Sequence, residues 1–202
     1  MDWSHGAQKL RGVYTRFRTF THPGMLWLDA AERGVCVCLN RAARQRSVKR
    51  LFALVSRLGD GIFWYGLMAA LVLLEGADGR VAALQMGLTA LVGVGIYKLL
   101  KGTLVRERPF VSHVGVMCAT APLDRYSFPS GHTLQAVLFT TLALAWFPWL
   151  APLLVPFALL VALSRVILGL HYPSDVVAGA VLGWLLARAA LWLMPPIGVI
   201  AG

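Results

Sequence analysis

Charged residues are scarce in this chain of 202 residues, because Asp, Glu, Lys and Arg together make up only 14% of it. In a soluble domain the charged share is usually about a quarter. Hydrophobic residues account for 58% of the chain, and the mean hydropathy is +0.68. The composition therefore excludes an ordinary water-soluble domain and indicates one domain whose solvent is largely lipid.

Acidic residues are the scarcer of the charged types, with 9 Asp and Glu against 19 Lys and Arg. This excess of basic residues suits an anionic membrane surface or an anionic substrate. Nucleic acid is a poor candidate for a partner, because no soluble basic domain is left once the apolar runs are removed.

Cysteine is also rare, with three residues at positions 36, 38 and 118. They form no disulfide framework, and Cys36 and Cys38 are too close together for a metal-binding pair. We therefore interpret all three as small apolar residues. A signal peptide is not expected, because the basic first 20 residues lack an apolar core and a cleavage site.

The N-terminal part of the chain is too charged to cross a bilayer. Residues 1 to 23 are polar and basic, and we expect them to be poorly ordered or to lie on the membrane surface. From Met25 to Leu58, apolar residues alternate with charged ones, which predicts interfacial amphipathic helix with Trp27 as a candidate anchor. We therefore expect a basic tail and interfacial helices over residues 1–58 and a transmembrane domain over residues 59–202.

The remaining apolar runs predict about five transmembrane helices. The runs are Gly61–Leu74, Val81–Leu100, Thr133–Phe147, Trp149–Leu163 and Val176–Met194. The first is short for a span of about 20 residues and is expected to borrow a turn on its N-terminal side. The predicted fold class is all-α, a polytopic membrane helix bundle of about five spans with an N-terminal interfacial amphipathic segment.

Polar residues beside these runs are expected to meet at one face of the membrane. If the spans alternate in direction, the end of the second span, the long loop and the start of the third share one side. The fourth span returns to that side and the fifth leaves from it. The residues brought together are Lys101, Arg108, Ser130, His132, Arg165, His171 and Asp175.

This combination of cations, histidines and a carboxylate suits phosphoryl chemistry. Lys and Arg neutralise phosphate oxygens, and Ser130 with Gly131 offers an N-cap and free N–H groups to an anion. A histidine acts as nucleophile or general acid because its pKa lies near the working pH. Asp175, in the first turn of the last helix, is close enough to accept a hydrogen bond from His171 and fix its tautomer.

Each of these residues has a simpler interpretation when it is considered alone. Lys101 and Arg165 suit the ends of spans, and Ser130 suits a plain N-cap. Asp175 suits the start of a helix, and His171 suits an interface. Catalysis is favoured because these separate explanations would have to coincide at one face.

Other polar residues of the loop are assigned to the surface. Arg106 and Glu107 are expected to be solvated loop residues. Asp124 and Arg125 are expected to pair with each other at the surface, with contact to a lipid headgroup as the alternative. Surface positions are also expected for the histidines His5, His22 and His113.

Three short motifs follow one another along the chain. They are Lys101-x6-Arg108-Pro109, Pro129-Ser130-Gly131-His132 and Ser164-Arg165-x5-His171-x3-Asp175. Together they resemble the three-part signature of the type 2 phosphatidic acid phosphatase superfamily, with no substitution in the defining positions. The resemblance covers residues 60 to 195 and leaves the N-terminal third unexplained.

The resemblance implies a role for each motif residue. His171 would attack phosphorus to form a phosphohistidine, Asp175 would raise its nucleophilicity, and His132 would protonate the leaving oxygen and then activate water. The phosphoryl oxygens would be held by Lys101, Arg108, Ser130, Gly131 and Arg165. It also implies no cofactor and no metal, because the cations supply the charge stabilisation that a metal gives elsewhere.

The function implied is that of an integral-membrane lipid phosphatase acting on a phosphate monoester or pyrophosphate. Undecaprenyl pyrophosphate is the leading substrate, phosphatidylglycerophosphate or phosphatidate is the alternative, and lipid A phosphate ranks third. A lipid phosphotransferase shares every residue discussed, whereas a non-catalytic lipid-binding or lipid-moving protein predicts decay of the catalytic positions, and none is seen. The expected partners are the lipid substrate and membrane lipids, and the oligomeric state is left open.

Two arguments disagree on which face of the cell inner membrane carries the site. Family precedent favours the periplasmic face. With five spans, the N-terminal segment lies on the same face as the site, and it carries 11 Lys and Arg before Ile62. The positive-inside rule places such a segment in the cytoplasm.

Overall fold

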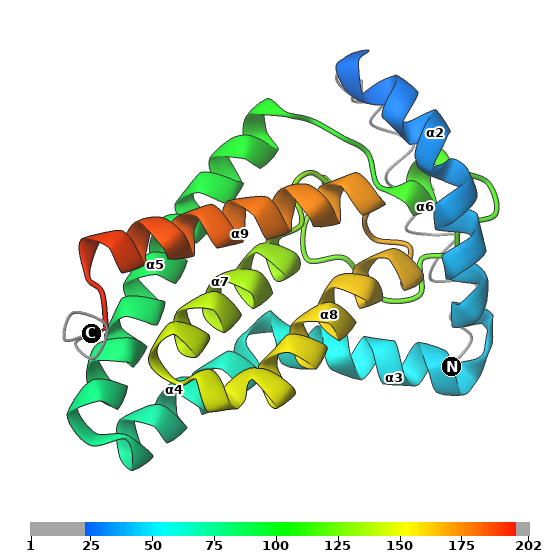
Figure 1. The fold of residues 1–202 in the computed structure, drawn as a ribbon. Helices are drawn as coiled ribbons and strands as arrows, with labels where there is room; N and C mark the ends of the chain where they lie inside the picture. Colours follow the sequence, from blue (N-terminus) through cyan, green and yellow to red (C-terminus); the bar gives the residue numbers. More distant parts are fainter. Residues whose placement is uncertain (1–22, 197–202) are drawn as a thin grey trace.

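The computed structural model describes residues 23–196 (Figure 1). The predictions for the basic tail, a signal peptide, His5 and His22 lie outside this range. Helices are the only regular secondary structure over residues 23–196. In chain order they are α2 (Pro23–Asn40), η1 (Arg41–Arg44), α3 (Arg46–Arg57), η2 (Leu58–Ile62), α4 (Phe63–Leu74), α5 (Gly76–Thr103), α6 (Pro109–Ser112), α7 (Gly131–Trp146), η3 (Pro148–Leu150), α8 (Ala151–Ile167) and α9 (Pro173–Leu193).

The predicted all-α membrane bundle is confirmed. Within the described residues, 4 helices are long and apolar enough to cross a membrane, namely Arg46–Leu74, Gly76–Thr103, Pro148–Ile167 and Pro173–Leu193. The remaining apolar run forms α7, which has 16 residues and packs against α5, α8 and α9. Its Leu134, Leu138 and Leu142 are fully buried, so α7 is the central helix of the bundle.

The first span does borrow from the segment before it. Helices α3 and α4 run on as one helix of 29 residues, Arg46–Leu74, with a kink at η2. Gly61 has φ +126° at this kink, a conformation that glycine adopts without steric cost. The adjacent Asp60 is thereby placed at a break in the helix. The division of the chain at residue 58 stays a prediction, although the helix continues through it.

The main core surrounds α7. Trp64 of α4 is fully buried and stacks on Phe139 of α7 with ring centroids 5.2 Å apart. Phe157 of α8 meets the same indole edge-on at 5.5 Å. Burial of such large apolar surfaces stabilises the bundle through close packing and aromatic contacts.

Helices α7 and α9 lie side by side because two glycines let their backbones touch. A Cβ on Gly179 would lie 2.4 Å from the carbonyl oxygen of Ser130, and one on Gly183 would lie 2.3 Å from that of Leu134. Small residues four apart permit such contacts between membrane helices. The backbone N–H of Ser130 donates to the carbonyl of Asp175 at 3.0 Å, so the two helices begin next to each other.

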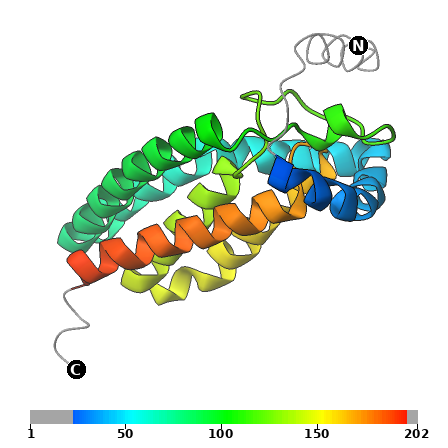
Figure 2. The same ribbon diagram turned by 90° about the horizontal axis from the view of Figure 1, so that it is seen from above.

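The N-terminal helix α2 lies with α6 at one end of the bundle (Figure 2). Asn40 fastens its C-terminal end there, because Nδ2 donates to the carbonyls of Met117 and Ile167, both at 2.9 Å. Its Oδ1 accepts from the N–H of Met117 at 2.7 Å. Cys36 is buried in this region and Cys118 packs against the same cluster, whereas Cys38 is exposed. The C-terminal end of α2 is therefore attached to the long loop and to the end of α8.

Candidate active site

A cavity of about 70 Å³ lies where α5 and α8 end and α7 begins. Most of the predicted site residues line it, namely Lys101, Arg108, Gly131, His132, Arg165 and His171. Ser130 and Asp175 are fully buried and do not line it. The cavity is also lined by residues that sequence reasoning did not assign to the site, namely Asp60, Tyr97, Leu123, Asp124 and Gln135.

The carboxylate of Asp124 bridges two of the predicted phosphate-binding cations. Lys101 Nζ lies 2.5 Å from its Oδ2, and Arg108 Nη2 donates to its Oδ1 at 2.6 Å. The prediction that Asp124 pairs with Arg125 is therefore wrong, and Arg125 instead lies 3.7 Å from Glu107. Two poorly solvated cations attract a carboxylate more strongly than one partly exposed guanidinium does.

This bridge keeps Asp124 ionised. Burial raises the pKa of the carboxyl, but Lys101 and Arg108 outweigh it and hold the pKa below its ordinary value. The side chain is still 37% exposed, so water reaches it. A phosphate oxygen carries the same charge as this carboxylate and would take the same donors.

Arg165 enters the cavity from the end of α8. Its side chain is 3% exposed, and Nη1 donates to the hydroxyl of Ser56 on α3. Its Nε is buried without a hydrogen-bond partner among residues 23–196. A buried donor of this kind is costly unless an acceptor binds to it, which suits an anion in the cavity.

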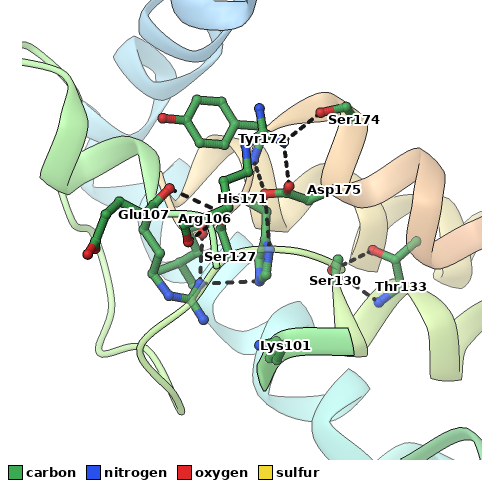
Figure 3. A network of polar contacts seen from close by, with 12 residues as sticks. Lys101, Arg106, Glu107, Ser127, Ser130, Thr133, His171, Tyr172, Ser174 and Asp175 are labelled. Carbon is green, nitrogen blue, oxygen red and sulfur yellow. Dashed lines mark hydrogen bonds and ion pairs between the residues drawn. The ribbon is translucent and has the colours of Figure 1, made fainter. Parts of the chain in front are cut away.

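His171 lies between the two sides of the site, with Asp175 on one side and Lys101 on the other (Figure 3). Its Nε2 is 3.2 Å from Arg108 Nη1. A guanidinium only donates, so Nε2 is the acceptor and the proton is assigned to Nδ1. Burial, then Arg108, Arg165 and Lys101, hold the pKa of His171 well below its ordinary value. The imidazole is therefore neutral at pH 7.

The hydrogen bond predicted from His171 to Asp175 is longer than such bonds are. His171 Nδ1 lies 3.6 Å from Asp175 Oδ2, and it has no hydrogen-bond partner within the described part of the chain. Asp175 Oδ2 accepts from the backbone N–H of Tyr172 at 2.8 Å. Its Oδ1 accepts from Arg106 Nη1 at 2.6 Å (Figure 3).

Arg106 is completely buried and Glu107 is 9% exposed, so the prediction that both are solvated loop residues is wrong. The guanidinium of Arg106 forms ion pairs with Asp29, Glu32 and Asp175. Such pairing is what makes a buried guanidinium tolerable. One signal in the sequence could have indicated this pairing. Asp29 and Glu32 are the two acidic residues of α2, and they need a buried cation as a partner.

The predicted general acid, His132, faces the kink in the first span. Its Nε2 lies 3.4 Å from Oδ1 of Asp60, and its side chain is 11% exposed. Asp60 was not predicted to belong to the site. A single carboxylate between two glycines in an apolar run was nevertheless a signal, because ionisable residues at such positions usually serve function.

Ser130 forms the N-cap of α7. Its Oγ lies 2.9 Å from the hydroxyl of Thr133 and accepts from the N–H of Thr133 at 3.4 Å. The simpler interpretation of Ser130 as a cap is therefore observed, and its contact with phosphate stays a prediction. Gly131 itself lines the cavity, where its backbone faces the ring of Tyr97.

Two larger cavities adjoin the small one. A cavity of about 430 Å³ shares Asp60, Leu123, His132 and Arg165 with it and extends along α3 to Arg57. An apolar cavity of about 430 Å³ between α4, α5 and α7 shares Gln135 with it. The small cationic cavity therefore borders a cavity of mixed polar and apolar lining on one side and an apolar cavity on another.

Comparisons with known proteins show that this chain is similar to lipid phosphatases. Residues 82–198 match the model of the PAP2 superfamily. A lipid A 1-phosphatase of Rhizobium etli is 31% identical over 160 residues, which cover 69% of this chain and 68% of that protein. The undecaprenyl-diphosphatase BcrC of Bacillus subtilis is 31% identical over 144 residues, which cover 66% of this chain and 71% of that protein.

A solved structure has the same fold. The crystal structure of Aquifex aeolicus LpxE aligns with a TM-score of 0.67 and 24% identity, over 79% of this chain and 93% of that chain. The family match includes Lys101, Arg108, His132 and His171, which meet in the cavity.

Proposed function

The chain belongs to the PAP2 superfamily, and on this premise we propose that it hydrolyses a phosphate monoester or pyrophosphate on a lipid headgroup through a phosphohistidine intermediate. As its sequence predicts, it is a multi-pass membrane protein of the phosphohydrolase class. The observation that carries the proposal is the position of His171 Nε2, which lies 3.2 Å from Arg108 Nη1 in a cavity lined by cations.

In the first step, Nε2 of His171 attacks phosphorus while the bond from phosphorus to the lipid oxygen breaks. Arg108 Nη1 releases Nε2, which frees the lone pair that attacks. Lys101 and Arg108 also release Asp124 and take the phosphoryl oxygens, and Arg165 offers its Nε. His132, protonated when it lies between the bound anion and the carboxylate of Asp60, transfers its proton to the leaving oxygen.

In the second step, His132 takes a proton from a water molecule whose oxygen attacks phosphorus. The bond between phosphorus and Nε2 breaks, and inorganic phosphate leaves. The imidazole of His171 is regenerated with its proton on Nδ1, facing Asp175. These two steps use two histidines in one cavity, His171 for covalent catalysis and His132 for proton transfer.

The adjoining cavities support undecaprenyl pyrophosphate as the substrate. The phosphate that is cleaved would occupy the small cavity, and the second phosphate would lie in the larger cavity of mixed lining, between Arg165 and Arg57. The start of the hydrocarbon chain would enter the apolar cavity beyond Gln135. Phosphatidylglycerophosphate or phosphatidate is the alternative, and lipid A phosphate follows.

A substrate panel separates these lipids. We expect the purified protein in detergent to give a higher kcat/KM with undecaprenyl pyrophosphate than with phosphatidylglycerophosphate, phosphatidate or lipid A. Product analysis with an added acceptor lipid distinguishes hydrolysis from transfer, because only a phosphotransferase yields phosphorylated acceptor. A higher kcat/KM with another lipid would reassign the substrate and leave the reaction class unchanged.

The mechanism is tested by His171→Gln in the presence of a chelator. We expect phosphate release to fall by more than about 1,000-fold, because the nucleophile is lost. His113→Gln is the matched control, since His113 lies outside the cavity. Full activity of His171→Gln would contradict the phosphohistidine step. Loss of wild-type activity with chelator, restored by a divalent metal, would contradict metal independence.

We further propose that the site opens to the periplasmic face. A single cysteine at Val114, which is 80% exposed in the loop, reports the side directly once the native cysteines are replaced. A membrane-impermeant thiol reagent is expected to label it in intact cells. Labelling only after permeabilisation would place the site in the cytoplasm, as the positive-inside rule favours.

A further inference from the structure

Arg106 is a buried arginine that the proposed chemistry does not use. All the hydrogen bonds of its guanidinium are made away from the cavity, and its side chain is 0% exposed. Nε donates to Asp29 Oδ1 and Nη2 donates to Glu32 Oε2, both at 2.8 Å. Nη1 donates to Asp175 Oδ1 at 2.6 Å and to the hydroxyl of Ser174 at 2.7 Å.

The ring of Tyr172 also fixes the orientation of the guanidinium plane of Arg106. The guanidinium lies over this ring with Cζ 3.9 Å from the ring centroid, an arrangement that favours a planar cation. Arg106 therefore joins the turn before α9, the first turn of α9 and helix α2 through one side chain.

The contact with Arg106 decides how Asp175 faces His171. The backbone N–H of Tyr172 binds Oδ2 and Arg106 binds Oδ1, so neither oxygen is free to rotate away. In this orientation Oδ2 points at the unpartnered Nδ1 of His171 from 3.6 Å. A small movement closes this gap to a hydrogen bond as charge develops on the imidazole.

Helix α2 holds the other side of the same assembly. Glu32 Oε1 accepts from the backbone N–H of Ser174 at 2.7 Å, and Oε2 accepts from its hydroxyl at 2.7 Å. Asp29 and Glu32 accept from Nε and Nη2 of the guanidinium, the two nitrogens that Asp175 does not contact. The start of α9 and Arg106 are thus both anchored to α2.

We propose that Arg106 is a positioning residue for the His171–Asp175 pair, and that α2, through Asp29 and Glu32, is a working part of the active site. The proposal rests on the proposed function, because it concerns the same nucleophile. Arg106 touches no reacting atom and acts through Asp175. It accounts for the N-terminal helix, which the motifs of the sequence leave unexplained.

The first test compares Arg106→Met and Arg106→Lys with the wild-type protein. We expect kcat of Arg106→Met to fall by about 10- to 100-fold, because Asp175 is no longer held in its orientation toward His171. KM and the Ki of inorganic phosphate are expected to change by less than about twofold, because the cavity cations stay in place. Arg106→Lys is expected to recover part of kcat, since it restores one ion pair.

A purely structural role for Arg106 predicts a different pattern. Loosening of the whole site would raise KM and the Ki of phosphate together with the loss of kcat, and that outcome would overturn the proposal. Unchanged kcat in Arg106→Met would also overturn it. Thermal unfolding in detergent is measured in parallel, and all assays are made well below the lowest melting temperature.

A double-mutant cycle tests whether Arg106 acts through Asp175. In an Asp175→Asn background we expect Arg106→Met to lower kcat by less than about twofold, because the carboxylate that it orients is already absent. Additive losses of kcat would show that Arg106 acts independently of Asp175 and would contradict the inference.

The contribution of α2 is tested by Glu32→Gln, with Arg33→Met as the control on the exposed neighbouring position. We expect Glu32→Gln to lower kcat severalfold at constant KM and Arg33→Met to leave both unchanged. If Arg106→Met does not fold, the comparison of Glu32→Gln with Arg33→Met tests the proposal instead. Unchanged kcat in Glu32→Gln would then overturn it. A wild-type protein that releases no phosphate from any lipid would instead contradict the proposed function.

Discussion

Arg106 and Arg108 are two residues apart and support opposite sides of His171. Both side chains are almost completely buried, with exposed fractions of 0% and 2%. Arg108 is paired with Asp124, whose side chain is 37% exposed. Arg106 is paired with three carboxylates, of which Asp175 is 0% and Asp29 is 9% exposed.

The counterions, and not the arginines themselves, distinguish the surroundings of Arg106 from those of Arg108. A cation that binds substrate needs a partner that water or phosphate can replace, and the half-exposed Asp124 meets that need. A cation that supports the fold of the site needs partners that cannot leave, because an unpaired buried charge is strongly destabilising. Under the proposed function, the same residue type would bind substrate on one side and hold the carboxylate of Asp175 on the other.

The largest effect that would separate the two arginines is expected from Arg108→Gln. We expect kcat/KM to fall by on the order of 100- to 1,000-fold, because a donor to the phosphoryl oxygens is lost. In contrast to Arg106→Met, the Ki of inorganic phosphate is expected to rise as well. Steady-state kinetics with and without added phosphate measure both. An unchanged Ki would mean that the two arginines do not differ in the way described.

Gly179→Ala is expected to damage both regions at once. Its Cβ would lie 2.4 Å from the carbonyl of Ser130, so α9 would have to move away from α7. We expect a loss of about 1–3 kcal/mol in the free energy of unfolding, as for other overpacked sites. Denaturation in detergent measures it, and Gly66→Ala is the control because its Cβ meets nothing within 4 Å. Equal stability of the two variants would show that α7 and α9 separate freely.

The smallest effect is expected from Asp124→Asn, which removes the replaceable counterion. We expect inorganic phosphate to bind about 3- to 10-fold more tightly, because it no longer competes with a carboxylate for Lys101 and Arg108. Competitive inhibition by phosphate at pH 7 measures this, since the pKa of Asp124 is lowered and the carboxyl is ionised there. Asp78→Asn, on an exposed carboxylate at the start of α5, is the control. Weaker phosphate binding in Asp124→Asn would mean that Asp124 helps to form the site.

Much of the fold was predictable because the lengths of the apolar runs and their order along the chain can be read directly from the sequence. The runs ending at Leu100 and beginning at Val176 reappear as α5 and α9 with shifted ends. The central position of α7 was less visible, because a buried helix and a membrane-spanning helix have the same apolar composition. Its burial depends on Gly179 and Gly183, whose effect appears only when α9 lies against it.

The cations and histidines that line the cavity were predictable, whereas its carboxylates and the pairing of its charges were not. Alternation of the apolar runs was enough to predict that Lys101, Arg108, His132, Arg165 and His171 lie at one end of the bundle, where they line the cavity. The carboxylate that pairs with each arginine follows from tertiary contacts alone. Asp29 reaches Arg106 across 77 residues, Asp175 reaches it across 69, and Asp124 reaches Arg108 across 16. Ion pairs depend on distance in space and on burial, and neither quantity is written in local sequence.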